Sequence, residues 1–121
     1  MFQGVHTVAI YVSNIARAKE FYIQILGFEH GWDVHDNLTF LKVGSTHVYL
    51  EGGYESHEIT DKSLRLSFFL EADESVKEIF EALRSNGVVT IQESPEQVGD
   101  DTWWFQFQDP DGNILEVSGK P

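Results

Sequence analysis

Hydrophobic and polar positions follow the same order twice along the chain. In the first copy, a strand-like run over 5–12, VHTVAIYV, precedes a helical stretch over 14–26 and three further strand-like runs that end at HVYLEGG (47–53). The second copy begins with LRLSFFLEA (64–72), continues with the helical stretch SVKEIFEALRSN (75–86), and ends at NILEVSG (113–119). Period-two alternation indicates strands, and apolar residues three and four positions apart indicate helices. The pattern predicts an α+β fold of two βαβββ modules.

The boundaries between these modules follow from composition. The segment GGYESHEITDK, residues 52–62, is polar and lacks periodicity, which is typical of a linker. We therefore expect a first module over 1–53, a linker over 54–62 and a second module over 63–121, together forming one compact domain of two repeats.

Both predicted helices have recognisable ends. Ser75 and Glu78 match a capping box at the start of the second helix, and Gly87 is well placed to end it. Ser13 or Asn14 can cap the first helix in the same way. These signals predict where each helix begins and ends.

The chain closes with the segment DPDGNILEV, residues 109–117. Pro110 presets φ for a turn, Asp109 can accept hydrogen bonds from the turn amides, and Gly112 suits a left-handed conformation. Glu116 then lies within an apolar strand. A buried carboxylate is costly unless a partner or a cation compensates its charge, so Glu116 is a candidate functional residue.

Aligning the two copies places His6 opposite Ser67 and Glu51 opposite Glu116. We expect all four side chains on the sheet face away from the helices, because alternation groups them opposite the residues that pack on the helices. The two copies thus predict a shared polar face.

Composition excludes several classes of function. The chain has no cysteine, so disulfides and thiolate chemistry are absent. Its formal net charge of −12 repels phosphate backbones and anionic membranes, and we expect no nucleic-acid or membrane partner. The N-terminal segment has neither a basic leader nor a long apolar run, which favours a cytoplasmic location.

Three segments carry a resemblance to a known family: HTVAIYVSNIARAKEFYIQILGF near the start, SVKEIFEALRSNGV in the middle and FQFQDPDGNILEV at the end. The chain resembles the vicinal oxygen chelate superfamily, which includes glyoxalase I, extradiol dioxygenases and bleomycin-resistance proteins. The resemblance implies paired βαβββ modules whose mixed sheets curl around a cleft, often in a homodimer.

The resemblance also implies a metal site. In metal-using relatives, ligands project from the first and last strands of each module, here the positions of His6, Glu51, Ser67 and Glu116. Serine is a poor ligand for a transition metal, so His6, Glu51 and Glu116 are left to hold Mn²⁺, Fe²⁺, Ni²⁺ or Zn²⁺. By resemblance Glu116 is the favoured catalytic base, with Glu51 second.

Two alternatives remain open for these residues. His6 can instead bridge Glu51 and Glu116 in a structural network, or the two carboxylates can share a proton, without any metal. The strand aromatics are either core or ligand-contacting residues. The expected substrate-binding residues are Ser67, Phe69, Trp32, Trp103 and Trp104.

Two functions follow. The first is a glyoxalase-like, metal-dependent lyase, isomerase or dioxygenase acting on a small molecule with vicinal oxygens. The second is a metal-free protein, resembling the bleomycin-resistance proteins, that sequesters a cationic aromatic small molecule in an acidic, aromatic-lined cleft. For either function we expect a homodimer, because a single pair of four-stranded modules leaves sheet edges and an open cleft that relatives cover with a partner.

Overall fold

The computed structural model describes residues 1–55 and 66–121, without the side chains of Leu66 and Ser67. The chain divides into two compact units, 1–56 and 57–121, and each is described by itself. Most of the linker predicted over 54–62 lies outside the described residues. No helix among the described residues is long and apolar enough to cross a membrane.

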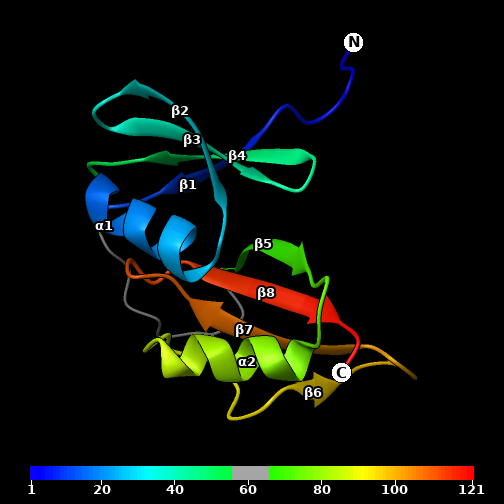
Figure 1. Ribbon diagram of the computed structural model, residues 1–121. Coiled ribbons are helices and arrows are strands. Elements are labelled where there is room, and N and C mark those ends of the chain that lie inside the picture. The colour runs from blue at the N-terminus through cyan, green and yellow to red at the C-terminus, as the bar shows by residue number, and fades with distance from the viewer. Residues whose placement is uncertain (56–65) are drawn as a thin grey trace. The chain divides into compact units, whose positions relative to one another are not determined.

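The first unit is a four-stranded mixed sheet with one helical segment (Figure 1). The strand order is β1-β4-β3-β2, with β1 parallel to β4 and the other pairs antiparallel. The helix α1 continues directly into a π-helical turn, η1. The elements are β1 (Val8–Tyr11), α1 (Ile15–Lys19), η1 (Glu20–Ile25), β2 (Glu29–His35), β3 (Leu38–Val43) and β4 (Thr46–Glu51).

The second unit repeats this topology, with the strand order β5-β8-β7-β6 and a parallel pair between β5 and β8. The predicted order βαβββ is therefore confirmed in both units, and neither sheet closes into a barrel. The elements are β5 (Leu66–Glu71), α2 (Val76–Ser85), β6 (Glu96–Gln97), β7 (Trp103–Gln108) and β8 (Ile114–Gly119).

The predicted helix ends are confirmed. The Asn14 side chain accepts a hydrogen bond from the Arg17 amide, and the Ser75 hydroxyl accepts one from the Glu78 amide. Gly87 adopts a φ of 79° just beyond α2, a conformation that a β-carbon would resist. Local signals thus set the length of each helix.

Alternate residues of β3, β4 and β7 are buried and contribute to the core on the helix side of each sheet. In the first unit Ile10 of β1 is only 2% exposed, and Leu50 of β4 is fully buried beside Ala18 and Tyr22 of the helical segment. In the second unit the core is formed by Phe80 of α2 with residues of β7 and β8 (Phe105, Phe107, Leu115 and Val117). The strand residues that alternate with these buried strand residues lie on the opposite, helix-free face of each sheet.

An ion-pair cluster joins β2 to the helix in the first unit. The Thr39 hydroxyl, the Lys19 ammonium at 2.9 Å and the His30 ring at 3.1 Å all contact Asp33, and they lower the pKa of that carboxyl well below its ordinary value of 3.8. A carboxyl with a lowered folded pKa stabilises the fold above its unfolded pKa, and this stabilisation is lost as the pH falls through the folded value.

We therefore expect Asp33→Asn to unfold at a lower temperature than the wild type at pH 7, with the difference shrinking as the pH falls below about 4. Thermal unfolding followed by circular dichroism at pH 7 and at pH 2 measures the difference in unfolding temperature. Asp36→Asn, on the adjacent turn, is the control and should unfold with the wild type at pH 7. An equal difference at pH 7 and at pH 2 would contradict the assignment.

Candidate functional site

The turn before β8 fixes the position of Glu116. The buried Asp109 carboxylate accepts hydrogen bonds from the amides of Asp111 and Asn113, both at 2.9 Å, and a third from the Asn113 side chain. Gly112 adopts a φ of 84°, as its place in the turn predicts. This network sets the register in which β8 leaves the turn, and hence which face carries Glu116.

Glu116 lies half-buried on the helix-free face of the second sheet. The Gln106 side chain donates to its Oε1 at 3.3 Å, and Gln92 is linked to Gln106 by two hydrogen bonds. These contacts hold one carboxylate oxygen of Glu116 by a neutral amide. The Glu116 side chain is therefore oriented by a neutral hydrogen-bond donor, the Gln106 amide.

Aromatic rings line the helix-free face of the first sheet. Trp32 of β2 stacks on Phe40 of β3, with ring centroids 4.5 Å apart and planes 12° apart. The ring centroids of Phe40 and Tyr49 of β4 are 5.5 Å apart, and those of His47 and Trp32 are also 5.5 Å apart, in an edge-to-face arrangement. We call Trp32, Phe40 and Tyr49 the aromatic row. Trp32 remains 49% exposed, so the row presents ring surface that the described residues of the first unit leave open.

Glu51 lies at one end of this row, within a cluster of tyrosines. Tyr54 donates to Glu51 Oε2 at 2.8 Å, and the Tyr54 ring packs 4.7 Å from that of Tyr11. The hydrogen bond to Glu51 raises the pKa of the Tyr54 phenol, and a hydrogen bond with Tyr11 raises the pKa of Tyr49. Both phenols therefore stay protonated near neutral pH, and the Tyr54 hydroxyl orients the Glu51 side chain.

The structure corrects the predicted match between the two copies. The amide of Val12 donates to the carbonyl of Glu51, and the amide of Ala72 donates to that of Ser118, so Glu51 corresponds to Ser118. Glu116 pairs with Phe69 of β5 in the same way that Tyr49 pairs with Ala9 of β1. The counterpart of Glu116 is therefore Tyr49, and the predicted equivalence of Glu51 and Glu116 is wrong.

His6 is also displaced from its predicted place. His6 precedes β1 and is exposed. The period-two pattern groups it with Val8 and Ile10, which face the helix. The prediction that this group of residues lies on the helix-free face is therefore wrong. Thr7, the next residue before β1, has a hydroxyl that donates to the His47 carbonyl at 2.9 Å, and the pairing of β5 with β8 shifts between Leu66 and Phe68. The side chain of Ser67 itself lies outside the described residues.

This register separates the predicted metal ligands of the first unit. Glu51 is level with Tyr11 at the end of β1, and His6 lies five residues earlier in the chain, before the strand begins. An extended segment of five residues spans about 16 Å, which is too far for two ligands of one ion. Within residues 1–55 and 66–121, no group of three or more His, Asp or Glu side chains is placed to hold a metal ion. His6 and Glu51 thus do not fit a shared metal.

The two neighbouring tryptophans of β7 face opposite sides. Trp103 lies on the helix side, where the Lys77 ammonium sits 4.2 Å above its ring, whereas Trp104 shares the helix-free face with Gln106 and Glu116. Trp104 and Trp32 therefore lie on a helix-free face, where ligand-contacting residues were expected. Trp103 lies on the helix side, so its predicted place on the ligand-binding face is wrong.

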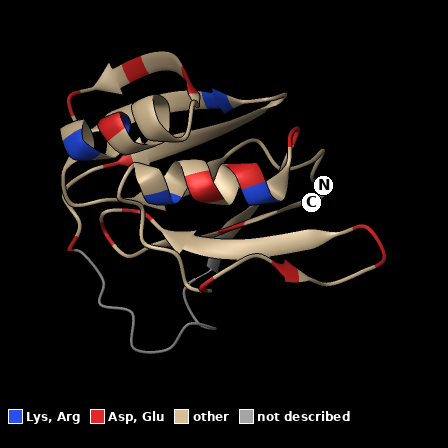
Figure 2. Ribbon diagram, turned by 60° about the horizontal axis from the view of Figure 1, so that its bottom comes forward, with Lys and Arg blue, Asp and Glu red and all other residues tan. Residues whose placement is uncertain are grey.

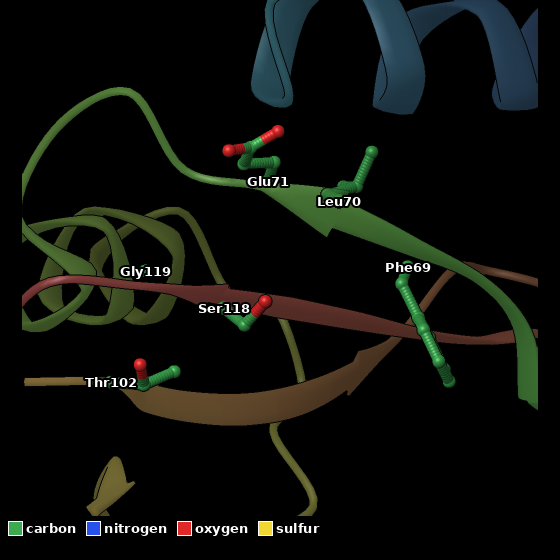
Figure 3. Close-up of a pocket in the computed structure, with 6 residues that line it drawn as sticks. All are labelled: Phe69, Leu70, Glu71, Thr102, Ser118 and Gly119. Atoms are coloured by element: carbon green, nitrogen blue, oxygen red, sulfur yellow. The ribbon is translucent and has the colours of Figure 1, made fainter. Parts of the chain in front are cut away.

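A separate hollow of about 400 Å³ opens at one end of the second sheet (Figure 3). Phe69, 64% exposed, lies on its rim, but the hollow includes neither Glu116 nor Trp104. Its lining comes from β5, the start of β7 and the end of β8 (Phe69, Leu70, Glu71, Thr102, Ser118 and Gly119).

Sequence reasoning missed the tyrosines around Glu51. Tyr49 could have been found from its alternation with His47 and Glu51 in β4, but Tyr11 and Tyr54 join the cluster only through the parallel pairing of β1 with β4 and the loop that follows. Asp and Glu positions are spread over helices, strands and loops (Figure 2).

Comparison with known proteins places the fold. The chain resembles a solved glyoxalase family protein from Enterococcus faecalis, with 28% identity over 98% of both chains and a TM-score of 0.76. It has the fold of TnmS3, an antibiotic binding protein from Streptomyces sp. CB03234 (21% identity, 99% and 98% covered, TM-score 0.75). It also has the fold of a lactoylglutathione lyase from Agrobacterium tumefaciens (20% identity, 96% and 92% covered, TM-score 0.73).

No curated protein matches the chain. The sequence model of one family matches residues 4–117, which is nearly the whole length. The paired βαβββ units, the closing turn and this match agree: the chain belongs to the Glyoxalase/Bleomycin resistance protein/Dioxygenase superfamily.

Proposed function

We propose that this protein binds a flat aromatic small molecule that carries a positive charge. The observation that supports this most is the exposed stack of Trp32 on Phe40. In this proposal the ligand ring packs on the aromatic row, and its cationic group lies beside Glu51.

Ring stacking supplies the apolar part of the binding energy. An aromatic pair contributes about 0.5–1.5 kcal/mol beyond the apolar area that it buries. The existing contact between Trp32 and Phe40 holds both rings in place before a ligand arrives, which lowers the entropy lost on binding. Tyr49 extends the row toward β4.

The Glu51 end favours a cation. Tyr54 orients the carboxylate, and the rings of Tyr11 and Tyr54 add faces on which an ammonium group is attracted. The formal net charge of −12 raises the local concentration of cations around the whole chain. A structural neighbour described as an antibiotic binding protein supports a binding role through its fold alone.

Calorimetric titration with 4-(aminomethyl)biphenyl tests this proposal. We expect Trp32→Ala to weaken binding more than tenfold, or about 1.4 kcal/mol, because it removes the exposed half of the stack. Trp103→Ala is the matched control, since Trp103 packs under Lys77 on the helix side, and it should bind like the wild type. Equal affinity of the wild type and Trp32→Ala would overturn the proposal, provided that both variants unfold cooperatively.

A metal-dependent lyase, isomerase or dioxygenase is the second candidate. It is supported by Glu116, whose half-buried carboxylate is oriented by Gln106. The position of the first unit that is equivalent to Glu116 carries Tyr49, and the ligand position implied by the resemblance in the second unit carries Ser67. Hydroxyl groups are weak ligands for transition metals. For this reason the second candidate ranks below ligand binding. Titration of the chain with Mn²⁺, Ni²⁺ and Zn²⁺, compared with Glu116→Gln, tests it separately. The homodimer expected from the sequence stays a prediction.

A further inference from the structure

The helix-free face of the first sheet is divided into three bands across β3 and β4. The antiparallel register sets Lys42 opposite His47, Phe40 opposite Tyr49, and Leu38 opposite Glu51. The first pair is basic, the second is aromatic, and the third ends in a carboxylate. Charge therefore changes sign along the aromatic row.

Lys42 is distinguished from the other basic residues. Among the Lys and Arg side chains in the described ranges 1–55 and 66–121, it alone has no ion pair, hydrogen bond or ring contact. Lys19, for example, is bound to Asp33, and Lys77 covers Trp103. In a chain with 20 acidic residues and 8 basic ones, an unengaged cation at the edge of an aromatic surface is available to a ligand.

His47 lies beside Lys42 and is positioned by the aromatic row itself. Its ring contacts the edge of Trp32 at 5.5 Å, and its side chain is half-buried. A neutral imidazole can donate one hydrogen bond from a ring N–H and a protonated one can donate two, so His47 can donate to an anion in either state. Lys42 and His47 together form what we call the basic end.

The spacing of the two ends defines a class of ligand. Residues 47 and 51 are four positions apart on β4, about 13 Å at 3.3 Å per residue, and Tyr49 lies midway. We infer that the ligand is zwitterionic: an elongated aromatic molecule with a cationic group at Glu51 and a carboxylate or similar anion at the basic end. This inference rests on the proposed function and names the specificity residues of the same surface.

Three matched probes test the inference by calorimetry: 4′-(aminomethyl)biphenyl-4-carboxylate, 4-(aminomethyl)biphenyl and biphenyl-4-carboxylate. We expect the zwitterion to bind about tenfold more tightly than either singly charged probe. With Lys42→Gln, the zwitterion should bind no more tightly than 4-(aminomethyl)biphenyl. With Glu51→Gln, it should bind no more tightly than biphenyl-4-carboxylate. Glu51→Gln keeps side-chain length and Lys42→Gln shortens the side chain by one atom. Both alter exposed or half-exposed positions, so the fold should persist.

The outcomes separate the two proposals. If the amine and the zwitterion bind equally to the wild type, and Lys42→Gln changes neither, the zwitterion inference is overturned while the proposed function stands. If none of the three probes binds, both are overturned. A charge reversal sharpens the result: Lys42→Glu should favour 4,4′-bis(aminomethyl)biphenyl over the zwitterion, and the opposite order would count against a basic end that contacts the ligand.

Discussion

Replacing Asp109 with alanine should lower the free energy of unfolding by about 3 kcal/mol or more. The Asp109 carboxylate is 4% exposed and accepts hydrogen bonds from two backbone amides and one side-chain amide in the turn before β8. Alanine would leave these donors without their acceptor, and each buried, unsatisfied group costs about 1–3 kcal/mol. Urea unfolding followed by tryptophan fluorescence measures the loss.

Asp109→Asn is the matched control. It keeps an acceptor oxygen for the backbone amides of Asp111 and Asn113 but replaces the second oxygen, which accepts from the Asn113 side chain, with an NH2 group. It should therefore lose some stability, but less than alanine. If Asp109→Ala unfolds at the same urea concentration as the wild type, the turn does not depend on this carboxylate.

A second large loss is expected for Phe80→Ala, of about 3–5 kcal/mol. Phe80 is 2% exposed on α2 and meets the ring of Phe105 edge-on, with centroids 5.1 Å apart, so its removal leaves a cavity between the helix and β7. Phe80→Leu fills most of that space and should lose much less. The same urea titration compares both variants, and equal losses would mean that the site collapses around the smaller side chain.

The elements of the fold could be predicted because their signals are local. The Asn14 and Ser75 caps, the glycine that ends α2 and the Asp109 turn each depend on residues within four positions of one another. Such contacts are specified by the sequence of a single segment, whatever the rest of the chain does. The order of the strands then follows from the repeated pattern.

The site could not be predicted in the same way, because it depends on the register between strands. Residues 12–14 connect β1 to α1, whereas residues 72–75 connect β5 to α2, one residue more. Aligning the copies through their helix caps therefore shifts the strands by one position, and a shift of one position moves a side chain to the opposite face. This is why His6 was expected on the helix-free face.

The pairing of Glu51 with Glu116 failed for a related reason. Both follow a leucine near the end of a module, LEGG in one copy and LEVSG in the other. However, β4 ends at Glu51, while β8 continues beyond Glu116 to Gly119. A short motif cannot show where a strand ends relative to its neighbour, and the parallel pairing with β1 and β5 decides it.

The proposed function depends on a cationic aromatic ligand stacking on Trp32. The chain has three tryptophans, whose indole N–H signals can be assigned by substitution and followed by NMR during titration with 4-(aminomethyl)biphenyl. We expect a saturable shift of the Trp32 signal, while the Trp103 signal under Lys77 stays in place. A titration in which the Trp32 signal does not move, or in which Trp103 moves instead, would contradict it.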